Sequence, residues 1–198
     1  MITRHLDIGC GPCPRNPFSC DEVYAVDLAL PAGIDTSKFV RANLSLEPIP
    51  FPDSTFDSVS AFDFLEHVPR ILPRADGQGT RFPFVELMNE IHRVLKPRGR
   101  LYAVTPAYPS PEAFQDPTHV NIITEGSWRY FCGDLPAARM YGFKGDFEMQ
   151  RNERALHPEA FKPMEPISWW RQHRRRRLLR TGRLSHLLWE FVCVKQGS

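Results

Sequence analysis

A glycine turn near the start of the chain constrains the fold more than any other stretch. Residues 4–8 form an apolar β-type segment that contains Asp7, and a Gly-Cys-Gly turn follows at 9–11. Glycines at such a turn let the backbone reverse sharply and approach a ligand with its amide groups exposed. A second apolar run, at 23–26, ends in Asp27. A glycine turn after one strand and an acid at the tip of the next predict an open α/β sheet that binds a nucleoside.

The bulk composition is that of an ordinary globular protein. The chain has 198 residues, of which 42% are hydrophobic and 24% charged, so one domain can bury a substantial core. No apolar run approaches the roughly 20 residues that span a bilayer. Asp7 and Gly9 interrupt the apolar start that a secretory signal needs. We therefore expect one domain over residues 1–198, no transmembrane segment and a cytoplasmic location.

The five cysteines do not follow the even, regular pattern of a secreted disulfide framework. Cys10, Cys13 and Cys20 lie close together in the sequence, which raises the question of a zinc site. Cys10 belongs to the glycine turn, however, and no fourth ligand lies nearby, whereas a structural zinc site needs four ligands. We expect reduced thiols and no bound metal.

The order of the predicted elements indicates a parallel sheet connected by crossovers. Pro12, Pro14 and Pro17 exclude a long helix after the first strand. Apolar residues at helical spacing predict an amphipathic helix at 82–95. The remaining expected elements are strands at 3–8, 22–27, 39–42, 58–62, 101–105, 143–154 and 186–195, a short helix at 124–131 and an exposed loop at 69–80. The predicted fold class is α/β: a Rossmann-like, doubly wound, mostly parallel sheet with a C-terminal antiparallel strand pair, in which a Pro-rich loop replaces the helix after strand one.

Several motifs together resemble the class I S-adenosylmethionine-dependent methyltransferases, and within them the type 11 methyltransferase domains. The motifs lie at residues 6–12 (LDIGCGP), 26–28 (VDL), 50–57 (PFPDSTFD), 64–68 (FLEHV) and 90–101 (EIHRVLKPRGRL). They follow the order and spacing of that family and cover about residues 4–106. The resemblance implies a methyltransferase with S-adenosyl-L-methionine as cofactor and S-adenosyl-L-homocysteine as product. It also implies a cofactor-binding half at 1–106 and a substrate-side half at 107–198.

The resemblance implies roles for the two glycines and the two aspartates of the first two motifs. Gly9 and Gly11 would pass under the methionine part of the cofactor, and Asp7 would face its amino group. Asp27 would accept hydrogen bonds from both ribose hydroxyls, which a carboxylate binds strongly. For the two acids, ordinary strand-end turns are the alternative interpretation.

Four further cofactor residues follow from the same resemblance. Asn43 and Leu44 would border the adenine, where an amide can both donate and accept hydrogen bonds. Phe62 and Asp63, at the end of the expected fourth strand, would lie beside the sulfonium and its methyl group. Core packing is the alternative for Phe62.

The sequence departs from the family at its start. Family members usually have a helical segment before strand one that covers the cofactor, whereas three residues precede that strand here. The prolines at 12–17 stand where a helix usually follows. We therefore expect a pocket that is open, or that another chain completes, as in a homo-oligomer.

The segment at 113–121 (AFQDPTHVN) follows the expected fifth strand, at the rim where substrates bind such sheets. It is similar to an Asp-Pro-Thr-His-Val segment of type 11 relatives found with sugar and polysaccharide biosynthesis. His119, oriented by Asp116, is the predicted general base for a hydroxyl acceptor. A histidine that only fixes its loop is the alternative. His67, in contrast, is expected to pack and form hydrogen bonds.

An arginine-rich segment is the main competing signal. Residues 168–183 contain seven arginines and no acid, next to Trp169 and Trp170, and the rest of the chain has 18 basic and 23 acidic residues. Basic side chains beside aromatic ones bind phosphates and stack on bases, or lie on an anionic membrane. The alternative is an exposed helix whose Trp and Leu side chains pack down while its arginines stay in water.

Three function hypotheses follow. The first is a methyltransferase that acts on a small-molecule or sugar acceptor, at oxygen. The second is an RNA- or nucleotide-directed methyltransferase that uses the arginines. The third is a non-catalytic cofactor-binding module that docks a partner, suggested by the missing N-terminal cover. Ala61-Phe62-Asp63-Phe64 stands where amino-directed adenine and glutamine methyltransferases have an Asn/Asp-Pro-Pro-Tyr/Phe motif, which argues against those classes.

Overall fold

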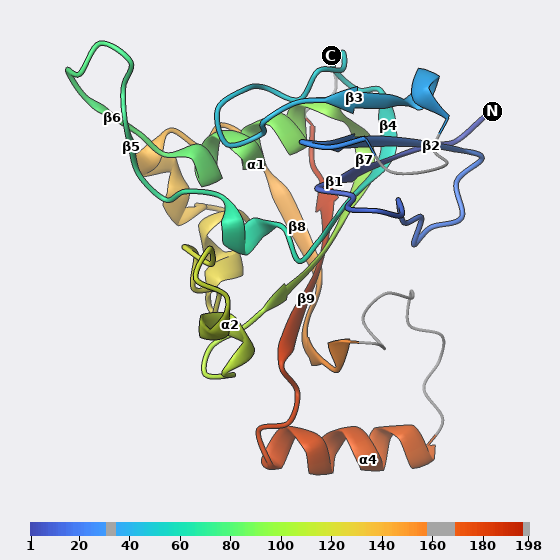
Figure 1. Ribbon diagram of the computed structural model, residues 1–198. Coiled ribbons are helices and arrows are strands. Elements are labelled where there is room, and N and C mark those ends of the chain that lie inside the picture. The colour runs from blue at the N-terminus through green and yellow to red at the C-terminus, as the bar shows by residue number, and fades with distance from the viewer. Residues whose placement is uncertain (31–34, 158–168, 196–198) are drawn as a thin grey trace.

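A seven-stranded sheet forms the centre of the protein (Figure 1). The computed structural model describes residues 1–30, 35–157 and 169–195. The strands of the sheet are β1 (Arg4–Ile8), β2 (Glu22–Asp27), β3 (Phe39–Arg41), β4 (Phe56–Phe62), β7 (Leu95–Pro106), β8 (Phe147–Ala155) and β9 (His186–Cys193). Their order across the sheet is β3-β2-β1-β4-β7-β9-β8.

The strand directions confirm the predicted fold class. The first five strands of this order pair in parallel. β9 runs antiparallel to both of its neighbours, β7 and β8. No helix lies between β1 and β2, as the prolines predict. The sheet is therefore Rossmann-like, with a C-terminal antiparallel pair and a Pro-rich loop after strand one.

One face of the sheet is covered by α1 (Pro83–Val94). The apolar residues of α1 recur at helical spacing, and Met88, Ile91 and Val94 are fully buried. Leu6 and Ile8 of β1 belong to the same core. The other helices of the described residues are α2 (Glu112–Gln115), α4 (Trp169–Arg180) and the 3₁₀ helices η1 (Thr36–Lys38), η2 (Leu65–His67), η3 (Ser127–Tyr130) and η4 (Ala137–Tyr141).

The opposite face has a smaller apolar cluster, which the Pro-rich loop covers. Phe18 of that loop packs edge-on against Tyr102 of β7, with ring centroids 5.8 Å apart. The Arg100 guanidinium lies 3.8 Å from the centroid of the Phe18 ring. The loop thus replaces a helix as the cover of this face.

Several elements differ from their predicted bounds or form, among them β8, which begins at Phe147 instead of residue 143. β7 begins at Leu95 instead of residue 101, because the chain leaves α1 directly into the sheet: Leu95 pairs with Phe56, and the register then shifts so that Arg100 pairs with Ser58. The loop at 69–80 contains a small hairpin of β5 (Leu72–Pro73) and β6 (Thr80–Arg81). The helix expected at 124–131 is the shorter 3₁₀ helix η3. Each difference arises from pairing or turn geometry that local propensity does not encode.

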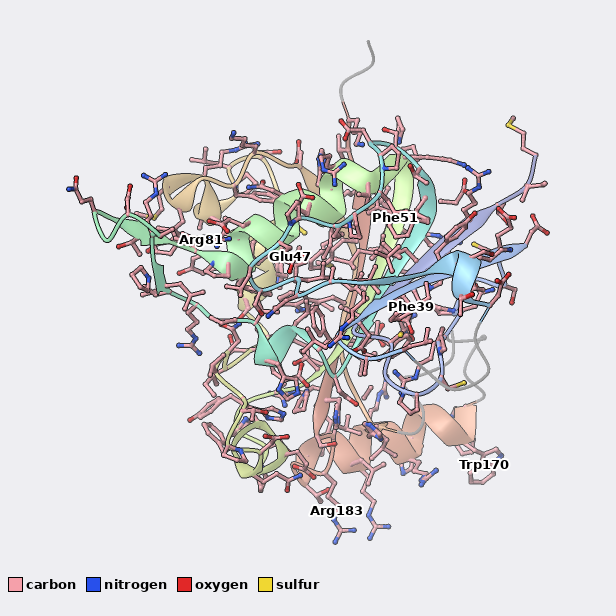
Figure 2. The ribbon with its side chains drawn as sticks, turned by 45° about the horizontal axis from the view of Figure 1, so that its top comes forward. Phe39, Glu47, Phe51, Arg81, Trp170 and Arg183 are labelled. Atoms are coloured by element: carbon pink, nitrogen blue, oxygen red, sulfur yellow. The ribbon has the colours of Figure 1, made fainter. Side chains whose placement is uncertain are left out.

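The arginine-rich segment forms α4, which stands apart from the sheet near the start of β9 (Figure 1). The alternative interpretation, in which its Trp and Leu side chains pack down, does not hold for most of them. Trp169 and Trp170 keep 65% and 75% of their surface exposed, and Leu179 is exposed too. Arginines occur all around this helix, so it has no apolar stripe to bury. Figure 2 shows Trp170 and Arg183 at the outer margin of the molecule. Among the described helices, none is long and apolar enough to cross a bilayer.

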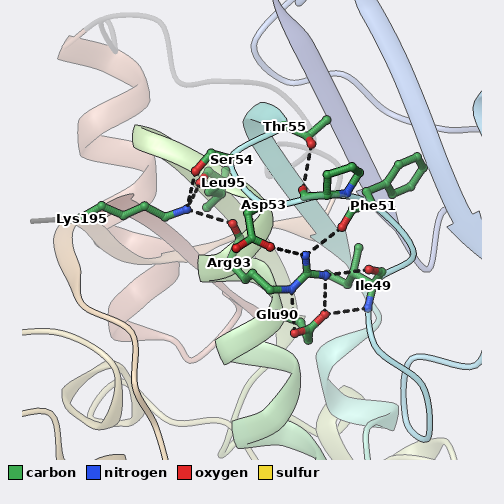
Figure 3. Close-up of polar contacts among 10 residues, drawn as sticks. Ile49, Phe51, Asp53, Ser54, Thr55, Glu90, Arg93, Leu95 and Lys195 are labelled. Carbon is green, nitrogen blue, oxygen red and sulfur yellow. Dashed lines mark hydrogen bonds and ion pairs between the residues drawn. The ribbon is translucent and has the colours of Figure 1, made fainter. Parts of the chain in front are cut away.

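Arg93, in the last turn of α1, ties the proline-rich loop between β3 and β4 to the helix (Figure 3). Its guanidinium donates to the carbonyl oxygens of Ile49 and Phe51, each at 2.8 Å, and to the carboxylates of Asp53 and Glu90. These acids raise the pKa of Arg93, the Glu90 hydrogen bond most of all. Arg93 therefore satisfies carbonyl groups that a proline-rich loop cannot pair internally.

The hydrogen bonds of Arg93 predict an effect on stability. Arg93→Ala should lower the free energy of unfolding by about 2 to 3 kcal/mol, because it removes charge-assisted hydrogen bonds and leaves carbonyl groups unpaired. Arg93→Lys should recover less than half of this loss, since an ammonium cannot reproduce the guanidinium fork. Urea unfolding followed by circular dichroism measures both values.

Arg4→Ala is the matched control, because Arg4 forms an exposed ion pair with Glu22 at 3.0 Å. Such a pair contributes at most about 1 kcal/mol. If Arg93→Ala and Arg4→Ala lower the free energy of unfolding equally, the hydrogen bonds of Arg93 stabilise the fold no more than an exposed ion pair does.

Candidate functional site

A pocket of about 640 Å³ opens at the carboxyl ends of the parallel strands. From β1 the chain adds β2 and β3 on one side and then crosses to β4 on the other. Ligands of open α/β sheets bind at such a switch point, and the volume lies in the range of small-molecule sites. Five of the eight predicted cofactor residues line this pocket: Gly9, Asp27, Asn43, Leu44 and Asp63.

Asp27 connects the glycine turn to the pocket. Its Oδ2 accepts a hydrogen bond from the Gly11 amide at 2.8 Å, and its Oδ1 accepts one from the Leu28 amide at 2.6 Å. Oδ1 also accepts a longer hydrogen bond from the Ala29 amide at 3.5 Å, whereas Oδ2 keeps a second lone pair for a ligand hydroxyl. Gly11 itself has a φ of +59° and does not line the pocket, and its contact with the methionine part of the cofactor stays a prediction.

Gly9 is in close contact with Phe64. Its φ is +61°, and a Cβ atom at this position would lie 2.3 Å from the Phe64 ring. Only glycine fits, for both reasons. Phe64 also lines the pocket, which the sequence did not predict, although the residue belongs to the motif at 64–68. Its ring forms the wall of the pocket over Gly9.

Asn43 and Leu44 reach the pocket through a turn that begins where β3 ends. The carbonyl oxygen of Asn43 accepts hydrogen bonds from the amides of Leu46 and Glu47. The Asn43 side chain oxygen accepts a further one from the Ser45 amide at 3.1 Å. These bonds fix the backbone, while the amide nitrogen of the side chain remains as a donor for the edge of a base.

Asp7 and Phe62 lie beneath the pocket and do not line it. Phe62 is 3% exposed and packs against Tyr102, with the Arg15 guanidinium 4.8 Å from its ring centroid. Asp7 is fully buried, and its Oδ2 accepts a hydrogen bond from the Arg15 amide at 2.8 Å. Asp7 therefore fixes the Pro-rich loop, and contact with a cofactor amino group stays a prediction.

A buried chain of hydrogen bonds joins Asp7 to β4. Ser60 Oγ donates to Asp7 Oδ1 at 2.5 Å, so the hydroxyl oxygen must accept from His5 Nε2 at 2.8 Å. His5 Nδ1 then accepts from Ser58 Oγ at 2.7 Å. This direction of donation requires a neutral imidazole, and burial lowers the pKa of His5 to about 4. Burial also raises the pKa of Asp7 to about 7, against the hydrogen bonds from Ser60 and Arg15.

The structure brings the predicted catalytic residues together at the rim, although they form no direct hydrogen bond. His119 Nε2 lies 3.9 Å from Asp116 Oδ2. Asp116 Oδ1 instead accepts from the amide and hydroxyl of Thr118, which lower its pKa. His119 Nδ1 faces the Ala113 carbonyl oxygen at 3.4 Å, so this carbonyl orients the ring. Asp116 acts on His119 through its charge.

His67 and Glu66 complete this rim. His67 lines the pocket, packs edge-on against His119 with centroids 4.8 Å apart, and forms a hydrogen bond with Thr118, as expected of a packed histidine. Glu66 is a residue that the sequence did not single out as functional. It is 1% exposed and accepts from Thr105 Oγ1, and burial raises its pKa to about 8. Glu66 is therefore mostly protonated at neutral pH.

All five cysteines are unpaired. Cys10 is buried in the glycine turn, and burial raises the pKa of its thiol to about 12. Such a thiol is unreactive, in agreement with its structural position.

Comparisons with known proteins give the family. Residues 6–103 match a family model described as a methyltransferase domain (Methyltransf_11). Among curated proteins, none matches the sequence.

Several solved structures share the fold. One is a chain of the Haloferax volcanii complex that contains the Trm112 methyltransferase activator, with 16% identity, a TM-score of 0.59, and coverage of 100% of this chain and 84% of that chain. Another is an S-adenosylmethionine-dependent methyltransferase from Mesorhizobium loti, with 17% identity, a TM-score of 0.55, and coverage of 96% and 92%. A third is the 1,6-didemethyltoxoflavin-N1-methyltransferase of Burkholderia thailandensis, crystallised with S-adenosylhomocysteine, with 17% identity, a TM-score of 0.52, and coverage of 97% and 71%.

At these identities the solved structures establish the fold alone, whereas the motif-bearing half matches the family directly. The pocket at the switch point agrees with the fold and with the family match, because a glycine turn and a strand-end acid meet there. The chain belongs to the S-adenosylmethionine-dependent methyltransferases, with a methyltransferase domain over residues 6–103.

Proposed function

We propose that this methyltransferase acts on an oxygen atom of a small-molecule or sugar acceptor, with His119 as general base. The observation that carries the proposal is the position of His119 on the rim, next to His67, which itself lines the pocket. A hydroxyl group is a weak nucleophile until a base removes its proton. An imidazole beside a residue that lines the pocket is the side chain best suited to act as that base.

The pocket residues fit the cofactor of the family. Gly9 contributes bare backbone to the pocket lining, and Asp27 lines the same pocket, whose volume suits a small molecule. Asp27 would bind the ribose hydroxyls, and Asn43 with Leu44 would border the adenine. When bound, the cofactor supplies a methyl group on a sulfonium, which is activated for displacement.

The residues of the rim handle the acceptor proton. His119 Nδ1–H points to the Ala113 carbonyl oxygen, which leaves Nε2 as the atom that takes the proton from the acceptor hydroxyl. Asp116 is ionised, because the Thr118 hydrogen bonds lower its pKa. Its carboxylate, 3.9 Å from Nε2, stabilises the imidazolium that forms. Glu66, being mostly protonated, adds little opposing or supporting charge.

The arginine-rich helix favours a second candidate, methyl transfer to RNA or a nucleotide. Arg176, Arg177 and Arg180 are exposed on α4, together with Trp169 and Trp170. Exposed cations beside exposed indoles are the chemistry that binds phosphates and stacks on bases. This candidate uses the same pocket and differs in its acceptor.

The role of Asp27 can be tested by cofactor binding. Asp27→Asn should weaken the affinity for S-adenosylhomocysteine by about tenfold or more, because a neutral amide loses the charge-assisted bonds to the ribose. Isothermal titration calorimetry measures the affinity, and Asp134→Asn, an exposed acid far along the chain, is the control. If the wild-type protein does not bind S-adenosylhomocysteine, both proposed methyl-transfer activities fail together.

The general base can be tested once an acceptor is found by screening sugars and nucleotides with labelled cofactor. His119→Ala should reduce kcat by roughly a hundredfold or more, with no comparable loss of S-adenosylhomocysteine binding. His173→Ala, a histidine on the exposed α4, should retain full activity. Unchanged turnover in His119→Ala would refute the assignment. Cofactor binding without turnover on any acceptor would favour the non-catalytic module.

The second candidate predicts a steep salt dependence of RNA binding. If α4 binds phosphates, the slope of log K against log salt for single-stranded RNA is about −0.7 per contact. Replacing Arg176, Arg177 and Arg180 by Gln should then reduce the slope by about 2, whereas Arg139→Gln should not change it. The absence of RNA binding at low salt would eliminate this candidate.

A further inference from the structure

The ends of three strands bring two histidines to one carboxylate. Asp63 directly follows β4, and His186 is the first residue of β9. His157 follows the end of β8, whose last residue, Ala155, pairs with His186. Strand pairing thus holds three segments together that are far apart in the sequence.

The donor atoms of this cluster lie close enough to share one ion. His157 Nε2 is 2.8 Å from Asp63 Oδ2, and His186 Nε2 is 3.4 Å from Asp63 Oδ1. One ligand atom from each of the three residues lies within 4.8 Å of the others. Zinc bonds of about 2.0 to 2.2 Å place neighbouring ligand atoms roughly 2.8 to 3.6 Å apart in octahedral or tetrahedral geometry. Both histidine–carboxylate distances lie within this range.

The state of the carboxylate also fits a cation. Asp63 Oδ1 is buried and has no hydrogen-bond partner of good geometry among the described residues. A buried carboxylate oxygen without a hydrogen bond is free to bind a cation that the two histidines also reach.

The surroundings of the histidines support the same conclusion. Ser185 Oγ lies 2.7 Å from His186 Nδ1, where it accepts the ring proton when Nε2 faces a metal. His157 keeps 47% of its side chain exposed, so an ion can reach the cluster from the solvent. An oriented histidine ligand is a feature of zinc sites.

We propose that Asp63, His157 and His186 bind a divalent transition-metal ion of the zinc type, with an open coordination position. Two imidazole nitrogens and one carboxylate favour zinc, cobalt or nickel over magnesium and calcium, which prefer all-oxygen sites. The sequence led to the opposite expectation, no bound metal. The three proposed ligands are far apart in the sequence and form no short metal-binding motif.

A second group, Glu66, His67 and His119, also has its ligand atoms within 4.8 Å of one another. A metal there would have to break the hydrogen bond between Thr118 and His67 Nδ1 or use the other ring nitrogen. It would also have to ionise Glu66, whose pKa burial raises to about 8. The Asp63 site needs neither change.

The metal site has a consequence for the acceptor. Asp63 also lines the cofactor pocket, so a hydroxyl bound at the open position would lie beside that pocket and lose its proton more readily. This consequence rests on the proposed function, whereas metal binding itself rests on the ligand geometry alone.

The proposal can be tested by metal titration of the full chain after removal of metal with a chelator. We expect one Zn²⁺ per chain by calorimetry, and a visible ligand-field absorption when Co²⁺ is added. His186→Ala and His157→Ala should each lower the Zn²⁺ affinity by about a hundredfold, since even residues behind a ligand contribute ten- to hundredfold. Circular dichroism checks the fold of each variant; should His186→Ala fail to fold, His157→Ala, at a half-exposed position, decides.

Two controls locate the ion. His67→Ala removes the competing group, and Cys13→Ser removes the exposed thiol; both should retain the wild-type Zn²⁺ affinity. No binding at one equivalent, or loss of binding in either control instead of the His157 and His186 variants, would overturn the proposal. S-adenosylhomocysteine binding, measured on the same samples, tests the proposed function separately.

Discussion

The rest of the structure depends on a buried line of hydrogen bonds between β1 and β4. His5 and Asp7 point to one face of the sheet, while Leu6 and Ile8, which alternate with them, enter the core under α1. In a doubly wound sheet a helix normally covers the second face with apolar side chains. Here the Pro-rich loop covers it, and the fully buried Asp7 holds the loop through the Arg15 amide. This line also fixes the two strands that flank the switch point, and therefore the floor of the pocket.

Two aspartates at strand ends connect this scaffold to its chemistry. Asp27 binds the glycine turn on one side and faces the pocket on the other. Asp63 lines the same pocket and contacts His157 and His186 on the side of the antiparallel strands. The proposed ribose ligand and the proposed metal ligand thus stand in one row of strand termini. This arrangement follows from a parallel sheet, in which the carboxyl ends of all strands reach the same edge.

The sequence predicted those pocket residues whose position depends on a short local pattern. Gly9 and Asp27 were found because a turn with positive φ and a strand-end acid have a sequence signature. Phe64 and Glu66 were not assigned a role, although both belong to a recognised motif, since their importance depends on what packs against them. A glutamate is usually exposed and ionised. Glu66 is mostly protonated only because it is completely buried. The alternative interpretation in which Trp169 packs down does not hold either, because burial again depends on what lies against the side chain.

The sequence by itself determined the order of helices and strands along the chain. It also determined the glycine turn, the acid at the tip of β2 and the loop that replaces a helix. Each of these depends on residues within a few positions of one another, through backbone conformation, periodicity or the missing amide of proline. Only the tertiary structure decided which polar groups are buried, which of them share protons, and that His157 and His186 meet Asp63. These outcomes depend on strand pairing between distant segments, because pairing, and not sequence distance, sets which side chains lie within reach of one another.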